Sequence, residues 1–420
     1  MDSPELVTHV LEPLPLWPGP RCLAEVPALA AALDGRRSLL PVPADDPARA
    51  GLLARTQRAG EPIAADVALV ACTSGSTGTP KGAMLTGANL RASIDATHAR
   101  LGGPGQWLLA TPPAHIAGLQ VLLRTLRAGE VPVAMELDDG FRPAAFAAAI
   151  GEMTGRRRYT SVVPLQLRRI LDDPAATEAL ASLDGVLVGG QATAPELLAR
   201  ARAAGITAVT SYGSSETSGG IAYDGVPLDG AEVTIGDDGG GDGSGRIIIS
   251  GPMVSRGYRN AESTEVSADL RPGAEDGAGV FRTSDAGRIM ATGDGAMAVT
   301  VLGRMDDVII SGGLKFLPGP IEDALASLDG VADAAVVGVP DPELGRAVVA
   351  AVTVTGDQAD GRVGDHAGEN IRERVAPLLG KHEVPRAVYV VKQLPTLPSG
   401  KLDRAGLAGT LAARWGMMSE

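Results

Sequence analysis

The residues best suited to chemistry lie in one short run, Thr73-Ser74-Gly75-Ser76-Thr77-Gly78-Thr79-Pro80-Lys81-Gly82. The run follows an apolar, strand-like segment, so it is expected to form a loop at the end of a strand. Its backbone N–H groups, hydroxyls and single cation are the groups that hold a polyphosphate. It lacks the Gly-Lys-[Ser/Thr] ending of a Walker P-loop, because Pro80 precedes Lys81 and Gly82 follows it. A hydroxyl-rich run alone is more typical of a loop without ligand, so the rest of the chain has to decide.

Composition limits the classes of function. The chain has 420 residues, enough for two or more domains with a large core, and its 45% hydrophobic and 21% charged content is typical of a soluble globular protein. The net charge of −13 argues against a nucleic-acid partner, because phosphate backbones need a basic surface. Any anionic substrate must therefore be met by locally placed lysines and arginines.

Cysteine usage and the chain start indicate a cytoplasmic protein. The two cysteines, Cys22 and Cys72, form neither a disulfide framework nor a metal pattern. The first residues are acidic and contain proline, unlike a secretory signal, and no apolar run reaches the length of a membrane span.

The middle of the chain alternates between short β-type runs and longer helical segments. Strands are expected at 107–111, 131–134, 159–163, 185–188 and 206–209. Helices are expected near 87–101, 116–126, 164–171 and 195–204. This alternation is typical of a parallel sheet flanked by helices. Residues 1–65 are loosely patterned, with a weak helix near 24–33.

Two further regions have different patterns. Residues 231–303 contain short strands with Gly/Asp turns, typical of a small antiparallel sheet or distorted barrel, and 236–245 is expected to be a hairpin loop. After residue 303, β-runs mixed with helices predict a compact α+β domain. The predicted fold class is thus α/β plus α+β. The expected division is a large domain over 1–303, a hinge at 304–306 and a small mobile domain over 307–420.

Seven short motifs occur in a fixed order. They are TSGSTGTPKG (73–82), PPAHIAGL (112–119), SYGSSET (211–217), GRIIISGPMVSRGY (245–258), FRTSDAGRI (281–289), GRMDDVIISGG (303–313) and LPSGKLDR (397–404). On these residues the chain resembles the adenylate-forming superfamily, which includes acyl- and aryl-CoA synthetases. The resemblance implies that a carboxylate attacks the α-phosphorus of ATP, that pyrophosphate leaves, and that a thiol then displaces AMP.

The resemblance also implies residue roles. Lys81 and Thr73, Ser74, Gly75, Ser76, Thr77 and Gly78 would hold the β- and γ-phosphates. Tyr212 would lie against adenine, near Gly190, Gly213 and Ser215. Asp285 would accept hydrogen bonds from the ribose hydroxyls, with Arg304 also at the nucleotide. Glu216 would be catalytic and would bind Mg²⁺, as a hard oxygen ligand for a hard cation.

The same resemblance makes the second domain a partner in catalysis. Lys401 would bridge the carboxylate and the α-phosphate during adenylation. Lys81 and Lys401 lie far apart in sequence, yet the implied mechanism needs both at one site. The small domain would therefore close over the large one, with Asp306 at the hinge. Gly312 and Gly313 would let the pantetheine arm of coenzyme A pass close to the backbone. Leu314-Lys315 departs from the Glu-Asn that is common there.

The acid is indicated by narrower patterns. His115 alone would more often be structural, but within PPAHIAGL it is expected at the acid pocket, with a catalytic role. Gln120 and Arg124 have i,i+4 spacing and therefore share one helix face. An arginine there is suited to bind a carboxylate, but the spacing alone fits a surface charge on an amphipathic helix equally well. The runs HIAGLQVLLRTLRAG and SVVPLQLRRIL resemble stretches of o-succinylbenzoate–CoA ligases of menaquinone synthesis. Gln166 and Gln191 are the other expected substrate-binding residues.

Several readings remain open. The implied substrates are ATP, coenzyme A and an aromatic diacid, with Mg²⁺, but another acid (benzoate-like, fatty or branched) fits the same motifs. An amino-acid adenylation unit would want an aspartate near His115, and none is present. A non-catalytic nucleotide-binding protein is disfavoured by intact Lys81, Glu216, Asp285 and Lys401. The oligomeric state is open, and a homodimer is compatible with the sequence.

Overall fold

The computed structural model describes residues 8–73, 79–236, 243–260, 269–271, 278–293, 295–354, 365–396 and 402–416, the side chains of 365 and 366 excepted. Predictions that fall on other residues, among them Ser74 to Gly78, Lys401 and much of the 236–245 loop, lie outside the described part of the chain.

The first sheet combines three strands from the loosely patterned residues 1–65 with the strand predicted before residue 73 and the strand that follows Lys81. It has five strands in the order β3-β1-β2-β4-β5. These are β1 (Thr8–Leu16), β2 (Ser38–Pro43), β3 (Pro62–Ala64), β4 (Val67–Cys72) and β5 (Gly82–Thr86), with helices α1 (Val26–Leu33) and α2 (Pro47–Thr56) between them. Prolines at alternate positions of β1 and β2 hid the strand pattern, since proline usually argues against a paired strand.

The second sheet carries the predicted alternation of strands and helices. Its order is β12-β11-β10-β9-β8-β6-β7, and the strands from β7 to β10 are parallel. The strands are β6 (Gln106–Leu109), β7 (Val133–Ala134), β8 (Arg158–Val162), β9 (Gly185–Gly189), β10 (Ala208–Ser214), β11 (Gly219–Tyr223) and β12 (Val226–Pro227). The helices are α3 (Gly87–Arg100), α4 (Ile116–Arg127), α5 (Pro143–Gly151), α6 (Pro164–Leu171), α7 (Pro174–Ala181) and α8 (Pro195–Ala203). Sequence analysis missed α5 and α7.

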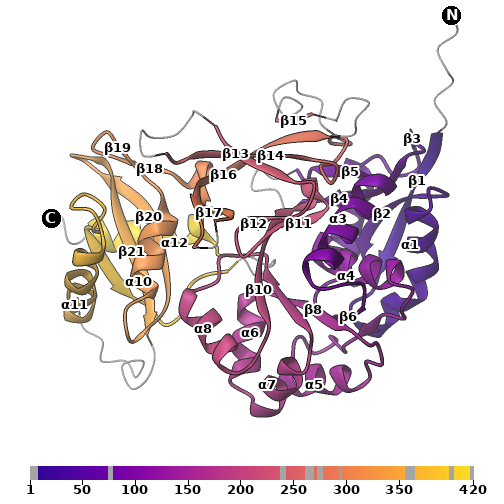
Figure 1. Ribbon diagram of the computed structural model, residues 1–420. Helices are drawn as coiled ribbons and strands as arrows, with labels where there is room; N and C mark the ends of the chain where they lie inside the picture. The colour runs from indigo at the N-terminus through magenta and orange to yellow at the C-terminus, as the bar shows by residue number, and fades with distance from the viewer. Residues whose placement is uncertain are drawn as a thin grey trace, which may run out of the picture.

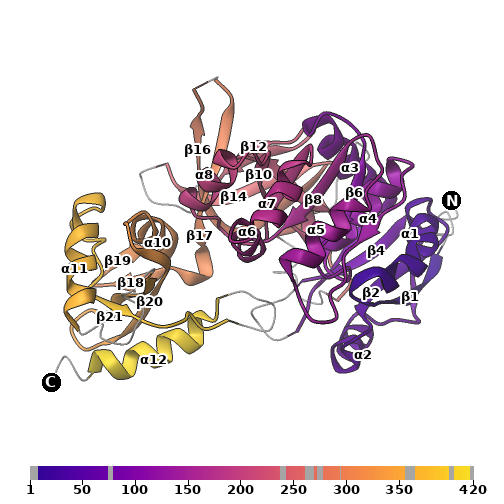
Figure 2. The same ribbon diagram turned by 90° about the horizontal axis from the view of Figure 1, so that it is seen from below.

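Helices cover both faces of this sheet (Figures 1 and 2). Leu108 and Val186 pack in a core with α5 to α8, whereas Trp107 and Leu187 pack with α3, α4 and the first sheet. Neighbouring residues of one strand thus enter different cores, as the period of two requires. Strands buried on both faces read as continuous apolar runs, and this is why they were recognisable in the sequence.

A third sheet is antiparallel, in the order β13-β14-β16-β15, with β17 paired to β16. Its strands are β13 (Glu232–Ile235), β14 (Gly245–Gly251), β15 (Leu270–Arg271), β16 (Gly279–Ala291) and β17 (Met297–Arg304). Strands β13, β14 and β17 correspond to the short strands expected between residues 231 and 303. The long β16 was missed, because its polar residues interrupt the apolar pattern.

The C-terminal region has its own cores. Strands β20 (Val331–Asp341), β21 (Gly345–Val354) and β22 (Ala387–Val390) form one sheet, and β18 (Ile309–Ser311) and β19 (Leu314–Phe316) form a hairpin. Val336 and Val348 face α10 (Pro318–Ala326) and α11 (Asp365–Val375), whereas Val337 and Val349 face α12 (Arg404–Gly416).

This region contacts the rest of the chain beyond the connecting segment. Arg168 on α6 forms a two-pronged ion pair with Asp333 on β20, at 2.8 and 2.9 Å. Within the C-terminal region itself, Arg404 at the start of α12 pairs with Asp307 at 3.2 Å and with Glu322 on α10 at 2.6 Å. Figure 1 shows the C-terminal elements in orange and yellow beside the β17 end of the larger part.

The α/β plus α+β fold class is confirmed by this architecture. Within the described ranges, the helices are all too short or too polar to span a bilayer.

Candidate active site

The segment around Lys81 is held by backbone pairing on both sides. The Lys81 carbonyl accepts a hydrogen bond from the Thr73 N–H at 2.8 Å, which joins the two ends of the hydroxyl-rich run. On its other side β5 pairs with a segment between β14 and β15 of the third sheet: Met84 N–H donates to Gly257 O, and Arg259 N–H donates to Gly82 O, both at 2.8 Å. Lys81 is therefore fixed between the first sheet and residues 257–259.

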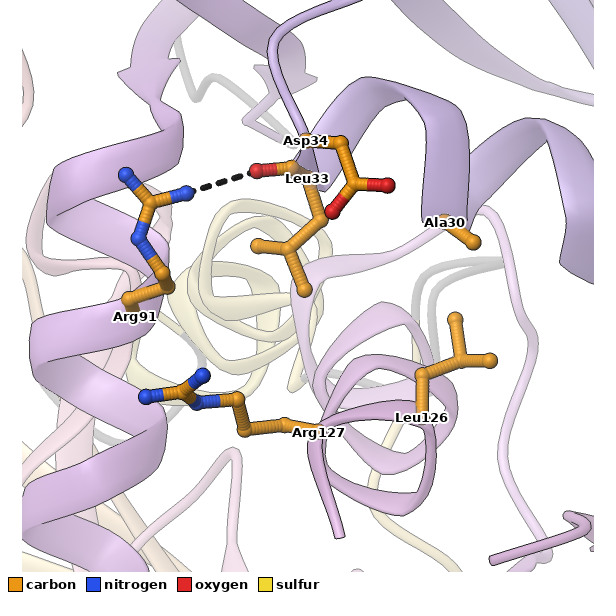
Figure 3. Close-up of a pocket in the computed structure, with 6 residues that line it drawn as sticks. All are labelled: Ala30, Leu33, Asp34, Arg91, Leu126 and Arg127. Atoms are coloured by element: carbon orange, nitrogen blue, oxygen red, sulfur yellow. Dashed lines mark hydrogen bonds between the residues drawn. The ribbon is translucent and has the colours of Figure 1, made fainter. Parts of the chain in front are cut away.

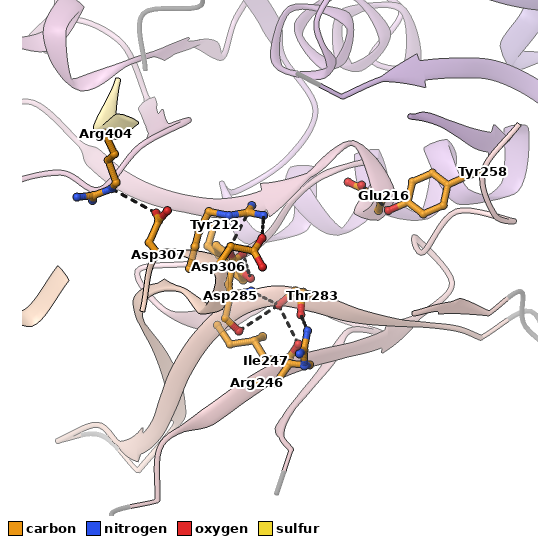
Figure 4. Close-up of polar contacts among 11 residues, drawn as sticks. Tyr212, Glu216, Arg246, Ile247, Tyr258, Thr283, Asp285, Asp306, Asp307 and Arg404 are labelled. Atoms are coloured by element: carbon orange, nitrogen blue, oxygen red, sulfur yellow. Dashed lines mark hydrogen bonds and ion pairs between the residues drawn. The ribbon is translucent and has the colours of Figure 1, made fainter. Parts of the chain in front are cut away.

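Lys81 meets a carboxylate through a tyrosine. Its ammonium nitrogen lies 5.3 Å from the centre of the Tyr258 ring, within cation–π range. The Tyr258 hydroxyl donates a 2.7 Å hydrogen bond to Glu216 Oε1, a contact visible at the right of Figure 4. Burial, followed by the Glu216 charge, raises the pKa of Tyr258, so the hydroxyl stays protonated and can donate.

Glu216 lies in a short 3₁₀ turn, Ser215–Thr217, at the end of β10, and its residue is only 7% exposed. The hydroxyl of Thr217 closes this turn by accepting from Ser214 N–H and donating to Gly219 O. Ser218, with a φ of 56°, then starts the return into β11. A buried carboxylate with one neutral donor retains lone pairs for a cation.

Tyr212 and Asp285 are brought together from two sheets. The Tyr212 hydroxyl on β10 donates a 2.8 Å hydrogen bond to Asp285 Oδ2 on β16. Burial, followed by the Asp285 charge, raises the pKa of Tyr212. Arg304 lies opposite Asp285 in the β16–β17 ladder, with 3.9 Å between Nη1 and Oδ1, and it also bonds Asp306 at 3.0 Å. Figure 4 shows Tyr212, Asp285 and Asp306 near its centre.

Glycine at position 213 has a steric reason. A Cβ there would lie 2.0 Å from the carbonyl oxygen of Gly219 on the adjoining strand, closer than atoms can approach. The ladder between β10 and β11 shifts register between Tyr212 and Gly213, as at a β-bulge, which aims Tyr212 toward the third sheet. Gly190, at the end of β9, has a φ of 84° and turns the chain there.

Two predicted residues at the acid side are buried. Gln120 donates to Ser218 O, and Arg124 Nη2 donates to the Tyr223 hydroxyl at 3.3 Å while its guanidinium lies 4.8 Å from the Trp107 ring centre. Arg124 is 3% exposed, and its Nε has no partner among the described residues. The shared helix face therefore points inward, which excludes the solvent-exposed alternative. His115 is exposed and begins α4 as its N-cap residue.

The other predicted acid-side residues lie apart from these. Gln166 uses both ends of its amide on the backbone, accepting from Val163 N–H at 3.0 Å and donating to Ala110 O at 2.7 Å. This position secures the start of α6 against the end of β6. Gln191 is exposed, directly after Gly190.

The predicted coenzyme A glycines form a tight turn. Gly312 and Gly313, with φ of 56° and 80°, connect β18 to β19 between the paired Ser311 and Leu314. A two-residue hairpin turn with both φ values positive strongly favours Gly-Gly. The pair is thus required by the turn, and its contact with coenzyme A stays a prediction.

A cavity of about 220 Å³ lies elsewhere, between α1, α3 and α4 (Figure 3). Its lining comprises Ala30, Leu33, Asp34, Arg91, Leu126 and Arg127. Both arginines are already bonded, Arg91 to Leu33 O and Arg127 to Asp95. None of the predicted site residues lines it, so we do not assign substrate to it.

Sequence analysis missed Tyr258, Asn260 and Gln57. Tyr258 stands at the end of the matched segment 245–258, which was the available signal, but no role follows from a tyrosine in a turn. The side-chain amides of Asn260 and Gln57 both donate to the carbonyl oxygen of Pro80. No local pattern indicates these bonds, because Pro80 lies 180 positions from Asn260 and 23 positions from Gln57.

The chain belongs to the AMP-binding enzyme family. The family model matches residues 22–259, and the model of the AMP-binding enzyme C-terminal domain matches residues 320–401. The predicted membership in the adenylate-forming superfamily is confirmed.

Individual relatives agree with this family. A "Probable 2-succinylbenzoate–CoA ligase" of Mycobacterium tuberculosis is 46% identical over 92% of this chain and 95% of its own length. A "Feruloyl-CoA synthase" of Amycolatopsis is 34% identical over 84% of this chain and 70% of its own length. The o-succinylbenzoate CoA synthetase of Bacillus subtilis, solved with its acyl-adenylate, shares the fold with a TM-score of 0.74 and 24% identity, covering 95% of this chain and 88% of that one.

The buried His98, close to Arg124, predicts that the free energy of unfolding depends on pH. Burial, then the charge of Arg124, lowers the pKa of His98 from 6.5 to about 4; Asp95 raises it and Arg127 lowers it further by smaller amounts. Between these values the unfolded chain binds more protons, so His98 makes folding less favourable as pH falls from 6.5 to 4, by up to about 3 kcal/mol. Urea unfolding at pH 7 and pH 4.5 should show a smaller difference for His98→Gln than for the unmodified protein. His382→Gln, at an exposed position, is the control. If the free energy of unfolding changed between the two pH values by the same amount in the unmodified protein and in His98→Gln, the lowered pKa would not belong to His98.

Proposed function

We propose that the protein ligates o-succinylbenzoate to coenzyme A at the expense of ATP, through an acyl-adenylate, in menaquinone biosynthesis. The observation that carries the choice of acid is the Mycobacterium tuberculosis relative named a probable 2-succinylbenzoate–CoA ligase, which is 46% identical over nearly the whole length of both chains. The convergence of Lys81, Glu216, Tyr212 and Asp285 from separate sheets supports the chemistry.

The first step needs charge neutralisation more than covalent help from the protein. A carboxylate oxygen of the acid forms a bond to the α-phosphorus, the bond to the bridging oxygen breaks, and pyrophosphate leaves with the electron pair. Lys81 is the proposed partner of the β- and γ-phosphates, with Thr73 and the hydroxyl-rich run. Tyr212 is proposed to face adenine and Asp285 the ribose, since a carboxylate suits two vicinal hydroxyls.

Glu216 fits the proposed Mg²⁺ site. Mg²⁺ in nucleotide sites is held by one or two carboxylates together with substrate phosphates. Glu216 is buried and connected to Lys81 through Tyr258, so its carboxylate is a suitable ligand for the ion. When bound, the ion would neutralise charge on the phosphates. Tyr258 holds one oxygen of the carboxylate by its hydrogen bond, and the described residues form no hydrogen bond with the other oxygen.

In the second step the sulfur of coenzyme A bonds to the acyl carbon and AMP leaves. We propose that the small domain, from residue 307, supplies Lys401 to the first step and turns about Asp306 for the second. Arg404, three residues after Lys401 in the sequence, bonds Asp307 beside Asp306, as the left side of Figure 4 shows.

A second candidate is ligation of an aromatic monoacid, favoured by the feruloyl-CoA synthase relative. Two further proposals concern the location of the protein and its oligomeric state. A cytoplasmic location follows from the substrates ATP and coenzyme A, and a homodimer stays a prediction of the sequence.

Arg124 is our candidate for the second carboxylate of the diacid. A guanidinium that is almost fully buried normally has an anionic partner, because burying an unpaired charge is costly. Arg124 has only the neutral Tyr223 hydroxyl and the Trp107 ring among described residues, and burial lowers its pKa. A carboxylate would complete its partners.

The choice of acid is tested by pyrophosphate release with coenzyme A and a panel of o-succinylbenzoate, ferulate, benzoate and octanoate. We expect kcat/KM for o-succinylbenzoate to exceed the others by about a hundredfold, since a site with a buried cation discriminates against acids that leave it unpaired. Equal turnover of ferulate would favour the second candidate.

Lys401→Ala should lower the adenylation rate by roughly a hundredfold or more, because electrostatic partners of a developing charge contribute about that much. Thioester formation from a supplied acyl-adenylate should be largely retained. Lys392→Ala, at an exposed lysine of the same domain, is the control. Equal losses in both half-reactions would refute the assigned role.

Arg124→Met keeps most of the buried volume and removes the charge. We expect KM for o-succinylbenzoate to rise about tenfold or more, because a charged hydrogen-bond partner is lost, while KM for benzoate changes little. Arg127→Met on the same helix, exposed and paired with Asp95, is the matched control. An unchanged KM for the diacid would reject Arg124 as its partner.

A further inference from the structure

The backbone next to Lys81 is held by two side-chain amides from distant parts of the chain. Gln57 Nε2 and Asn260 Nδ2 both donate to the carbonyl oxygen of Pro80, at 2.8 and 2.7 Å. Asn260 Oδ1 accepts from the N–H of Gly82 at 3.1 Å. The peptide groups on both sides of Lys81 are therefore bonded to Asn260, and one of them is also bonded to Gln57.

The packing around these amides is specific. Gln57 is fully buried at the end of α2, and a Cβ on Gly82 would lie 2.1 Å from its Oε1. Only glycine at position 82 lets the glutamine side chain reach Pro80. Gly82 in the TPKG segment is thus required by this contact, independently of any ligand.

Asn260 is itself fixed to the other site residues. It follows Tyr258 and Arg259, whose segment pairs with β5 and whose tyrosine contacts both Lys81 and Glu216. Arg259 Nε donates to Gln57 O at 3.3 Å and Arg58 Nη2 donates to Arg259 O at 2.7 Å, which joins the two amide-bearing segments. Displacing Asn260 would move the Lys81 backbone relative to the Tyr258 ring.

We propose that Gln57 and Asn260 are positioning residues for Lys81, and that their amides set the location of its ammonium group in the ATP site. The proposal rests on the proposed role of Lys81 at the β- and γ-phosphates. Hydrogen bonds to the peptide groups on both sides of Lys81 fix the point from which its flexible side chain extends, and small displacements of a positioned group are costly to catalysis.

The test measures KM for ATP, KM for the acid and kcat in ATP–pyrophosphate exchange, together with the thermal midpoint. Asn260→Ala should raise KM for ATP about tenfold, leave KM for the acid within about twofold and lower kcat. Gln57→Met, which keeps the buried volume and removes one of two donors, should raise KM for ATP about threefold. This variant keeps the proposal testable if Asn260→Ala folds poorly.

Asn89→Ala is the matched control. Asn89 Nδ2 donates to a proline carbonyl, that of Pro252, at the same 2.7 Å, but at the start of α3. It should lower the thermal midpoint with KM for ATP unchanged. If Asn260→Ala and Gln57→Met lower only the midpoint, as Asn89→Ala does, the residues are structural and the proposal is overturned.

A double-mutant cycle separates this proposal from the proposed function. In a Lys81→Ala background, Asn260→Ala should raise KM for ATP no further, because the positioned group is gone. If both changes raise KM independently, Asn260 does not act through Lys81. If Lys81→Ala alone leaves KM for ATP unchanged, the assigned role of Lys81 fails, and the positioning proposal with it.

Discussion

The hydrogen bond between Tyr258 and Glu216 joins parts of the molecule that no local interaction would bring together. Glu216 lies in the turn after β10 of the second sheet, and Tyr258, between β14 and β15 of the third sheet, pairs with β5 of the first. All three sheets therefore meet within the reach of one side chain. The location of Lys81 over the Tyr258 ring depends on this meeting, as does the orientation of the Glu216 carboxylate.

The cores explain why the polar groups collect there. The second sheet is buried on both faces, so its middle offers no place for the polyphosphate of ATP. Polar side chains are tolerated where strands end and sheets adjoin, and β10 ends in the run that contains Tyr212 and Glu216. In parallel sheets, ligands bind beyond the carboxyl ends of the strands, and this site follows the rule. The Tyr212–Asp285 bond then ties the strand end to the third sheet.

Much of the fold could be predicted, because alternating strands and helices and ordered motifs are local signals. In the first sheet, the strand before residue 73 was predicted, but β1 and β2 were missed because prolines at alternate positions obscure a strand pattern. Within the site, Tyr212 and Asp285 were both named, but their contact spans 73 positions and no pattern encodes it. Gln166 was named for a substrate contact, which stays a prediction; no sequence pattern encoded the bond that its amide donates to Ala110 O, 56 positions away.

The proposed chemistry is tested most directly by mass spectrometry of the protein incubated with ATP, Mg²⁺ and o-succinylbenzoate without coenzyme A. We predict that o-succinylbenzoyl-AMP and pyrophosphate form in equal amounts, and that added coenzyme A converts the adenylate to the thioester with release of AMP. Formation of ADP and phosphate, or no adenylate from this acid while another acid gives one, would contradict the proposal.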